Sequence, residues 1–153
     1  MLITYPALFY YDDTDDVAAV YSIFFPDFIE CGATQGESIE DAMFMASDFL
    51  GIAVADFIES NEELPKPSNI NNLSLEKNDP FKDHEDINMD YDKEKSFISM
   101  VSVDLKDYLN QDIPVKKTLT IPKWADKLGK EMQVNFSQLL TEAIADLKLQ
   151  KKS

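Results

Sequence analysis

The N-terminal part of the chain alternates between apolar segments of strand length and short polar connections. Residues 2–11 (LITYPALFYY) and 17–25 (VAAVYSIFF) are rich in β-branched and aromatic residues, and the polar sequence DDTDD at 12–16 joins them. Two such segments around a polar connection predict a β-hairpin. Both alternating faces of the second segment are largely apolar, so we expect a helix to cover one face of the sheet.

A long helix is predicted to follow a loop that is punctuated by Pro26, Gly32 and Gly36 and holds one short strand around 33–35. The sequence SIED at 38–41 fits a helix start, with Ser38 covering early amide groups and Asp41 facing the positive helix end. Apolar residues then recur at intervals of three and four, which predicts a helix to about residue 60. These residues are Ile39, Ala42, Met43, Ala46, Phe49, Leu50, Ala53 and Phe57.

The middle of the chain is predominantly polar. Residues 69–95 are rich in Asn, Asp, Glu and Lys with few apolar positions, which predicts an exposed connection. The segment SFISMVSVDL at 96–105 again resembles a strand, and we expect it to return to the N-terminal sheet. Residues 1–110 are therefore predicted to form an α+β domain, an antiparallel sheet with a helix, that carries a polar insert at 69–95.

The C-terminal segment, residues 114–150, is predicted to form a strand and two helices. Strict alternation in VKKTLTI divides residues 115–121 between two faces: Lys116, Thr118 and Thr120 on one, and Val115, Lys117, Leu119 and Ile121 on the other. Pro122 suits a first helical turn, and the two segments with helical spacing, 124–132 and 136–149, are separated by QVN. A lone strand leaves backbone groups unpaired and the helices leave an apolar face open, so we expect this segment to pair with a second copy of itself.

The formal net charge of −15 is unevenly distributed along the chain. Residues 1–70 contain fourteen acidic residues against one lysine, and residues 71–113 contain eleven against five; residues 114–153 reverse the balance, with four against eight. Because phosphate affinity requires clustered basic residues, the first seventy residues cannot hold a nucleic-acid site. They can instead attract a basic partner.

The polar face of the predicted strand has the chemistry of a DNA-binding surface. Two antiparallel copies would form a ribbon that presents Lys116, Thr118 and Thr120 from each chain, and such a ribbon fits the DNA major groove. This segment resembles the ribbon-helix-helix repressors, in which the strand contacts bases and the second helix presents its N-terminal amides to phosphate. The resemblance implies that Asn135 caps the second helix, and that the amides of Phe136 and Ser137 with the Ser137 hydroxyl bind the DNA backbone.

This chain departs from many ribbon-helix-helix proteins in one respect. They carry arginine on the strand or beside the serine, whereas all fourteen cationic residues here are lysine, which excludes bidentate arginine contacts to guanine or phosphate. A ribbon that serves only dimerisation, without DNA, remains an alternative interpretation.

The N-terminal domain resembles the HicB-type antitoxins through several separated motifs that occur in order. The family pattern is a strand pair, a Phe-Pro-Asp/Gly turn, Cys-x-Thr-x-Gly-Glu/Asp-Ser/Thr, and a helix that begins with acids and alanine. The matching residues are Phe25-Pro26-Asp27, then Cys31 to Ser38 (CGATQGES), and Glu40-Asp41-Ala42. The sequence VSVDLKDYL at 101–109 is similar to the last strand of the family, which commonly appends a ribbon-helix-helix segment.

The resemblance implies a partial ribonuclease-H-like N-terminal domain that binds and neutralises a HicA-type toxin, a small mRNA-cleaving ribonuclease, and a C-terminal domain that represses the operon by binding operator DNA. The toxin would contact acidic residues of the N-terminal domain, and the candidates are Asp12, Asp13, Asp15, Asp16, Asp27 and Glu30. An acidic surface fits this role because it can occupy the cationic face with which a toxin binds RNA. The chain would act as a homodimer, and the sequence leaves open whether dimers pair into tetramers.

Three other classes of function are an enzyme, a stand-alone repressor and an acidic scaffold. Ribonuclease-H enzymes hold two metal ions with clustered carboxylates, but DDTDD falls in a predicted turn, where neighbouring side chains do not converge, so we expect neither catalysis nor a metal or cofactor. No apolar window reaches the length of a membrane span and no secretory leader is recognisable, which predicts a cytoplasmic protein. The remaining alternatives are a stand-alone ribbon-helix-helix repressor with an acidic partner-binding domain, and an acidic scaffold that does not bind DNA.

Overall fold

The computed structural model describes residues 1–14, 20–84, 89–109 and 114–150, which divide into two compact units. One unit spans Leu2–Leu109 and is called the body below. The other contains the C-terminal residues from Asn110 onward, and its described part, residues 114–150, is called the tail. Each unit is described by itself.

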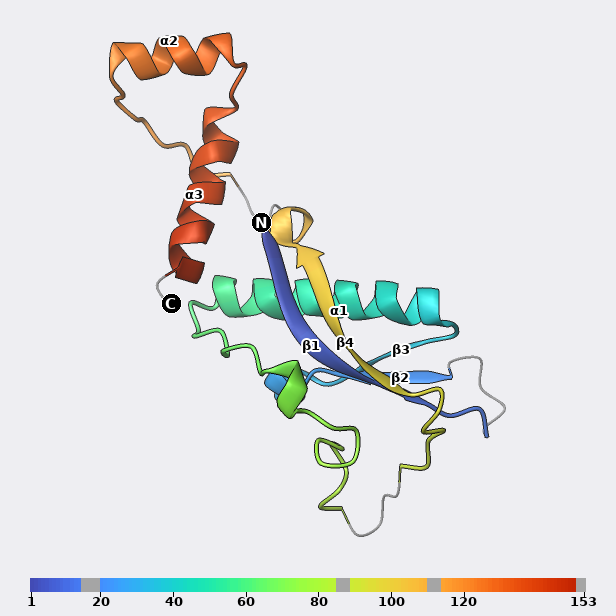
Figure 1. Ribbon diagram of the computed structural model, residues 1–153. Helices are drawn as coiled ribbons and strands as arrows, with labels where there is room; N and C mark the ends of the chain where they lie inside the picture. Colours follow the sequence, from blue (N-terminus) through green and yellow to red (C-terminus); the bar gives the residue numbers. More distant parts are fainter. Residues whose placement is uncertain (15–19, 85–88, 110–113, 151–153) are drawn as a thin grey trace. The chain divides into compact units, whose positions relative to one another are not determined.

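The body is built on a four-stranded antiparallel sheet in the order β3-β2-β1-β4 (Figure 1). The strands are β1 (Leu2–Tyr11), β2 (Tyr21–Phe24), β3 (Thr34–Gly36) and β4 (Phe97–Asp104). The predicted hairpin is confirmed, since β1 pairs with β2 from Leu8 opposite Phe24 to Tyr11 opposite Tyr21. The return of the last strand is also confirmed, because β4 pairs with β1 over its whole length. The second strand is shorter than the predicted 17–25, and residues 17–19 lie outside the described part of the chain.

Helix α1 (Ile39–Glu59) covers one face of this sheet. It begins as predicted, because the Ser38 hydroxyl accepts a hydrogen bond from the Asp41 amide (3.1 Å) and the Asp41 carboxylate accepts one from the Glu37 amide (2.9 Å). Aromatic residues of the body join the helix to the sheet: Phe49 stacks on Phe25, with ring centroids 5.6 Å apart. Ile39 was predicted in the apolar face but is about half exposed, because it lies at the first helical position.

The opposite face of the sheet is covered by the segment between α1 and β4, the green to yellow part of Figure 1. The Tyr10 hydroxyl donates to the Leu75 carbonyl (2.7 Å), and the Tyr10 ring meets Tyr91 edge-on at 4.9 Å. Phe24 meets Phe81 in the same geometry at 5.8 Å. The apolar residues that gather here are Leu8, Tyr10, Phe24 and Ile98 of the sheet, with Leu75, Phe81, Met89 and Tyr91 of the insert.

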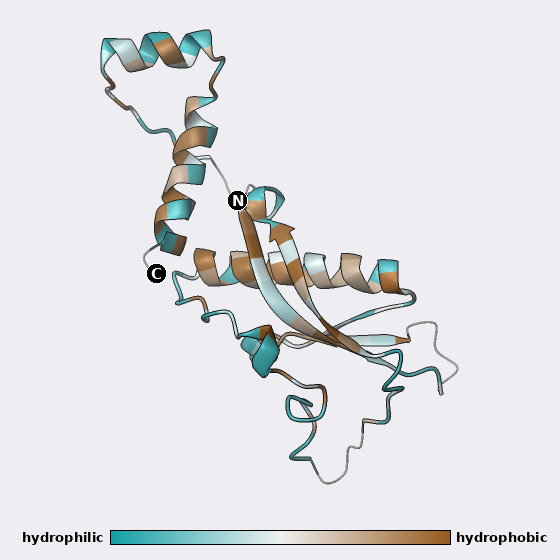
Figure 2. Ribbon diagram, in the orientation of Figure 1, coloured by the Kyte–Doolittle hydropathy of each residue, from teal (hydrophilic) through white to brown (hydrophobic). Residues whose placement is uncertain are grey.

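The expectation that residues 69–95 form an exposed connection is therefore wrong for their apolar positions. The insert is mostly hydrophilic, with a few hydrophobic positions, as Figure 2 shows. Those few side chains are irregularly spaced, so they form no sequence pattern, but each lies on an apolar sheet face that would otherwise meet water. Residues 85–88 of the insert lie outside the described residues.

Short 3-10 helices connect the main elements of the body. They are η1 (Pro26–Cys31), η2 (Ile70–Asn72) and η3 (Leu105–Asp107). After η3, Tyr108 returns to α1, where its hydroxyl donates to the Asp48 carboxylate (2.9 Å) and its ring lies over Gly51. Burial, together with Asp48, raises the pKa of Tyr108 to about 12. The end of the body is thus held against the same helix that covers the sheet.

Glycine is required at position 36, where β3 meets the first turn of α1. A Cβ atom added to Gly36 would lie 2.5 Å from backbone atoms of Ala42. We expect Gly36→Ala to lower the free energy of unfolding of the body by about 1–3 kcal/mol, because neither backbone can yield easily. Urea unfolding followed by far-ultraviolet circular dichroism measures the loss. Gln35→Ala, an exposed change in the same strand, is the control, and an equal loss in both variants would contradict the proposed contact.

Candidate functional site

In the tail, the extended segment before the helices keeps the predicted alternation of its side chains. Its odd-numbered residues line a groove of about 480 Å³ together with apolar residues of α3 (Phe136–Gln150). The lining residues are Val115, Lys117, Leu119, Ile121, Asp126, Phe136, Ser137, Leu140, Thr141 and Ile144. The even-numbered residues Lys116, Thr118 and Thr120 are exposed and are not among them. The three predicted base-contacting side chains therefore share the face that points away from the groove.

Residues 114–121 form no strand within the single described chain. A β-strand is defined by hydrogen bonds to a neighbouring strand, and the described part of the tail contains no second extended segment to supply them. The predicted strand therefore stays a prediction about the paired state.

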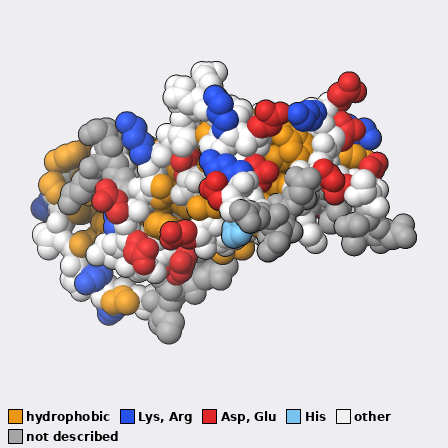
Figure 3. Space-filling view, turned by 90° about the horizontal axis from the view of Figure 1, so that it is seen from below, with side chains coloured by type: hydrophobic (Ala, Val, Ile, Leu, Met, Phe, Trp, Pro, Cys, Tyr) orange, Lys and Arg blue, Asp and Glu red, His pale blue; other side chains and the backbone are white. Residues whose placement is uncertain are grey.

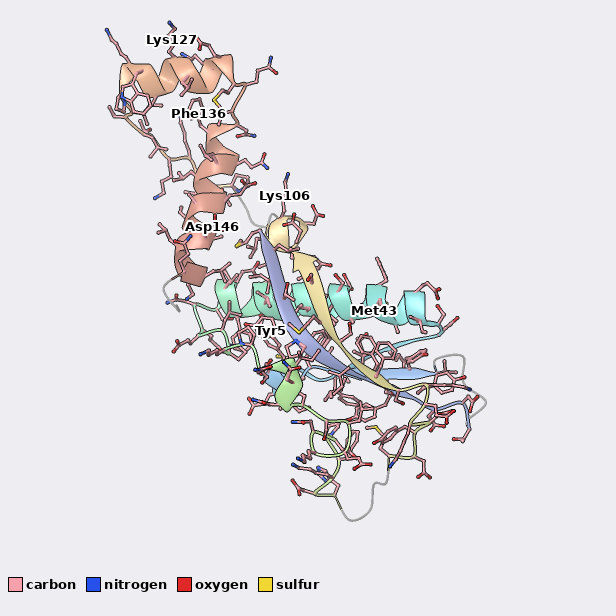
Figure 4. All side chains as sticks on the ribbon, viewed as in Figure 1. Tyr5, Met43, Lys106, Lys127, Phe136 and Asp146 are labelled. Atoms are coloured by element: carbon pink, nitrogen blue, oxygen red, sulfur yellow. The ribbon has the colours of Figure 1, made fainter. Side chains whose placement is uncertain are left out.

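The two predicted helices of the tail are present as α2 (Lys123–Glu131) and α3. They meet where the Phe136 ring, at the start of α3, lies against Gly129 of α2; the labelled Phe136 in Figure 4 stands between the two helices. A Cβ atom at Gly129 would lie 2.4 Å from that ring. The turn between the helices is closed by a hydrogen bond from the Val134 amide to the Gly129 carbonyl (2.8 Å).

Asn135 caps α3, as the resemblance implied. Its side-chain oxygen accepts a hydrogen bond from the amide of Gln138 (3.1 Å). The amides of Phe136 and Ser137 belong to the first helical turn, where geometry provides no intrahelical acceptor. They remain available for an anion, and the positive end of the helix dipole favours one at that position.

The tail exposes an unusual amount of apolar surface for a segment of 37 residues. Trp124 is 70% exposed, and it is the only tryptophan in the chain. The other large apolar side chains of the tail that are well exposed are Val115, Leu119, Ile121, Leu128, Met132, Phe136, Leu139, Ile144 and Leu147. Such surface is typical of a segment that completes its core with a partner.

The candidate toxin-contact residues of the body lie in two separate places. Asp12 and Asp13 follow β1 at one end of the hairpin, whereas Asp27 and Glu30 follow the other end of β2, in η1. Because the β1–β2 register sets these ends apart, the structure does not bring the two groups together. Asp15 and Asp16 lie outside the described residues.

Several of these carboxylates already have partners within the body. The Thr14 hydroxyl (2.7 Å) and amide (2.9 Å) donate to Asp12 and lower its pKa, so this carboxylate stays ionised at neutral pH. Both oxygens of Asp27 accept hydrogen bonds from Ser68, at 2.5 Å from the hydroxyl and 3.0 Å from the amide, which ties η1 to the chain beyond α1. Glu30 is exposed. Within the described ranges, no three His, Cys, Asp or Glu side chains are grouped to hold a metal ion.

The comparison with known proteins identifies the family. A family model described as the HicB-like antitoxin of bacterial toxin-antitoxin systems matches residues 4–75. A chain in the solved toxin-antitoxin complex from Streptococcus pneumoniae is 67% identical to this one, with a TM-score of 0.72, and the match covers 95% of this chain and 99% of that one. The chain belongs to the HicB-like antitoxin family. It is thus an antitoxin of a toxin-antitoxin system, and its α+β fold is the one expected from the sequence.

Another solved antitoxin and a search of curated sequences were also compared with this HicB-like antitoxin. The crystal structure of the Burkholderia pseudomallei antitoxin HicB is 21% identical, with a TM-score of 0.48 over 93% of this chain and 96% of that one. No curated protein sequence matches the chain. Membership in this family identifies the chain as the antitoxin component of a toxin-antitoxin system. None of the helices among the described residues of this antitoxin has the length and apolar character needed to cross a membrane.

Sequence reasoning missed the contact on which the geometry of the tail depends. Gly129 was noted only as part of a helical segment, although a glycine inside a helix weakens it and so indicates a close approach by a neighbouring group. That neighbour is the Phe136 ring. Phe136 was predicted as an apolar residue of the second helix and through its backbone amide, but not as a contact of Gly129. Phe136 also lines the groove on the side away from the predicted base-contacting face.

Substitution of Gly129 tests this contact. We expect Gly129→Ala to displace the Phe136 ring and to destabilise the tail of the antitoxin by about 1–3 kcal/mol. Trp124 fluorescence during urea unfolding reports on the tail alone, because the body contains no tryptophan. Lys127→Ala, at an exposed position of the same helix, should change the midpoint little. An unchanged midpoint for Gly129→Ala would show that the two helices do not meet there.

Proposed function

We propose that the body of this antitoxin binds and neutralises a HicA-type ribonuclease toxin, and that two paired tails repress the operon of the two proteins by binding operator DNA. The division of charge supports this assignment of roles. The first seventy residues carry fourteen acids against one lysine, whereas residues 114–153 carry eight lysines against four acids. The acidic body attracts a basic RNA-binding protein and repels DNA, and the basic tail does the reverse.

The observation that carries the DNA-binding part is the separation of faces in residues 115–121. The odd side chains line the groove with Phe136, Leu140 and Ile144, while Lys116, Thr118 and Thr120 point elsewhere and are exposed. When two copies pair through this segment, the apolar groove becomes the shared core and six polar side chains form one surface. The threonines then contact base edges or thymine methyl groups, and the lysines contact guanine or phosphate.

The cap of α3 supports a second contact to DNA in the proposed complex. Asn135 fixes the first turn, so the amides of Phe136 and Ser137 and the Ser137 hydroxyl can bind a phosphate beside the ribbon. With no arginine in the chain, affinity rests on a small number of lysine contacts and should fall steeply as salt rises.

The toxin-neutralising part is supported by the family and by the relative of known structure. The 67% identical chain comes from a structure that is described as a toxin-antitoxin complex, and the match extends over nearly all of both chains. The same kind of partner is therefore proposed here. Operator DNA and a second copy of this chain are the other proposed partners, and no cofactor is required for any of these steps.

Two variants separate the proposed activities. We expect Lys116→Ala to weaken binding to DNA from the protein's own promoter by about tenfold or more and to flatten its salt dependence, because each dimer loses two cations. Thr118→Ala should reduce sequence discrimination more than overall affinity. Fluorescence anisotropy with labelled DNA measures both effects.

The control and a toxin assay accompany these measurements. Lys66→Ala, which removes the only lysine of the first seventy residues, should leave DNA binding unchanged. All three variants should still protect cells from the toxin. If Lys116→Ala abolished toxin neutralisation together with DNA binding, the two activities would not belong to separate units.

A further inference from the structure

Helix α1 presents an outward face whose composition differs from that of an ordinary surface helix. Its inner side chains, Ala42, Ala46, Leu50 and Val54, are fully buried against the sheet. On the outward side Phe44 is 69% exposed and Ile52 is 58% exposed. Two large apolar side chains two turns apart on one helix face are a candidate contact surface, because a partner that covers both removes apolar area from water.

Acidic residues surround these two apolar side chains. Helix α1 contains five acids, Glu40, Asp41, Asp48, Asp56 and Glu59, and not one lysine, arginine or histidine. Among the described residues, no ion pair engages any of the five. Helix α2 of the tail differs, since Asp126 pairs with Lys130 at 2.7 Å and Glu131 pairs with Lys127 at 3.8 Å. The negative charge of α1 is therefore left uncompensated by the helix itself.

The acidic loops of the body do not combine unpaired acids with two exposed large apolar side chains. Asp13 lies 3.9 Å from the Lys95 ammonium. Asp12 and Asp27 accept hydrogen bonds from Thr14 and Ser68, as Asp48 of α1 does from Tyr108, so the difference lies in the apolar neighbours. None of Asp12, Asp13 and Asp27 is accompanied by a pair of exposed large apolar side chains from its own element. Among the described acidic segments of the body, the α1 face combines exposed apolar side chains, which gain free energy when a partner covers them, with negative charge that attracts a basic partner over a distance.

We propose that this α1 face, defined by Phe44, Asp48, Ile52, Asp56 and Glu59, is the surface through which the antitoxin holds its toxin, a partner with lysines or arginines around an apolar recess. The assignment rests on the proposed function of the body and supplies its contact residues. Phe44 and Ile52 fill the recess and are covered on binding. The acids lie at the rim, where they pair with the basic residues that the toxin otherwise uses for RNA.

The position of Tyr108 gives this face a fixed support. Its hydroxyl bonds to Asp48 and its ring lies over Gly51, so the end of the body braces α1 from the side next to Ile52. The face is therefore already shaped before the partner arrives, which lowers the ordering cost of binding.

The test measures binding of the full-length antitoxin and its variants to the toxin of the Streptococcus pneumoniae complex by isothermal titration calorimetry. We expect Phe44→Ala and Ile52→Ala each to weaken binding about tenfold or more. Asp56→Lys should also weaken it, mainly by slowing association at low salt. Leu2→Ala is the matched control, because Leu2 is also strongly exposed, at 71%, but lies in β1.

The outcomes distinguish this inference from the function on which it rests. Circular dichroism and operator binding should be the same for all four variants, because the changed side chains are exposed. If the wild-type protein binds the toxin and the three α1 variants bind it equally well, the α1 face is not the interface, although the antitoxin function stands. If the wild-type protein itself does not bind, the proposed neutralisation fails and this inference fails with it.

Discussion

The sheet of the body has apolar side chains on both faces, and the need to cover each of them determines much of the structure. Helix α1 covers the face that carries Phe9 and Val101, while a largely polar insert places Leu75, Phe81, Met89 and Tyr91 over the other. Because α1 uses only one side for this purpose, its opposite side is free to carry Phe44 and Ile52. Figure 3 views the molecule from below, where the insert lies in Figure 1, and on that face too hydrophobic side chains are visible beside acidic ones.

The tail must also cover its apolar side chains, but it has fewer residues with which to do so. Two short helices and one extended segment cannot enclose their own apolar side chains, so the groove between residues 115–121 and α3 stays open in a single copy. The proposed pairing of two tails would resolve this shortage and would give the extended segment the hydrogen-bonding neighbour that it lacks. In this account dimerisation and DNA binding arise from one event, because the strand that closes the core also turns its lysines and threonines outward.

Regular patterns made parts of this structure predictable, and irregular ones did not. Alternation predicted the β1–β2 pair, and the Ser38 cap followed from residue type and position. The Asn135 cap was implied by the resemblance to the ribbon-helix-helix repressors. The covering role of the insert was not predictable, because its four apolar residues are spread over a polar segment and match no period. Only the folded structure shows that they pack on the sheet. The hydrogen bonds between Asp27 and Ser68, or the contact of Gly129 with Phe136, depend on chain segments meeting in space. The outward face of α1 went unnoticed because Phe44 and Ile52 fall between the positions that form the buried stripe.

The central claim is that one chain joins an acidic surface for a basic toxin to a basic surface for DNA. The most direct test is to purify the tagged protein from its native cell and to identify by mass spectrometry whatever accompanies it. The account predicts a small basic protein encoded beside it, bound to a dimer of this chain that still shifts its own promoter DNA. A clean homodimer that binds the promoter but brings no such protein would contradict it, because the acidic body would then have no toxin to hold.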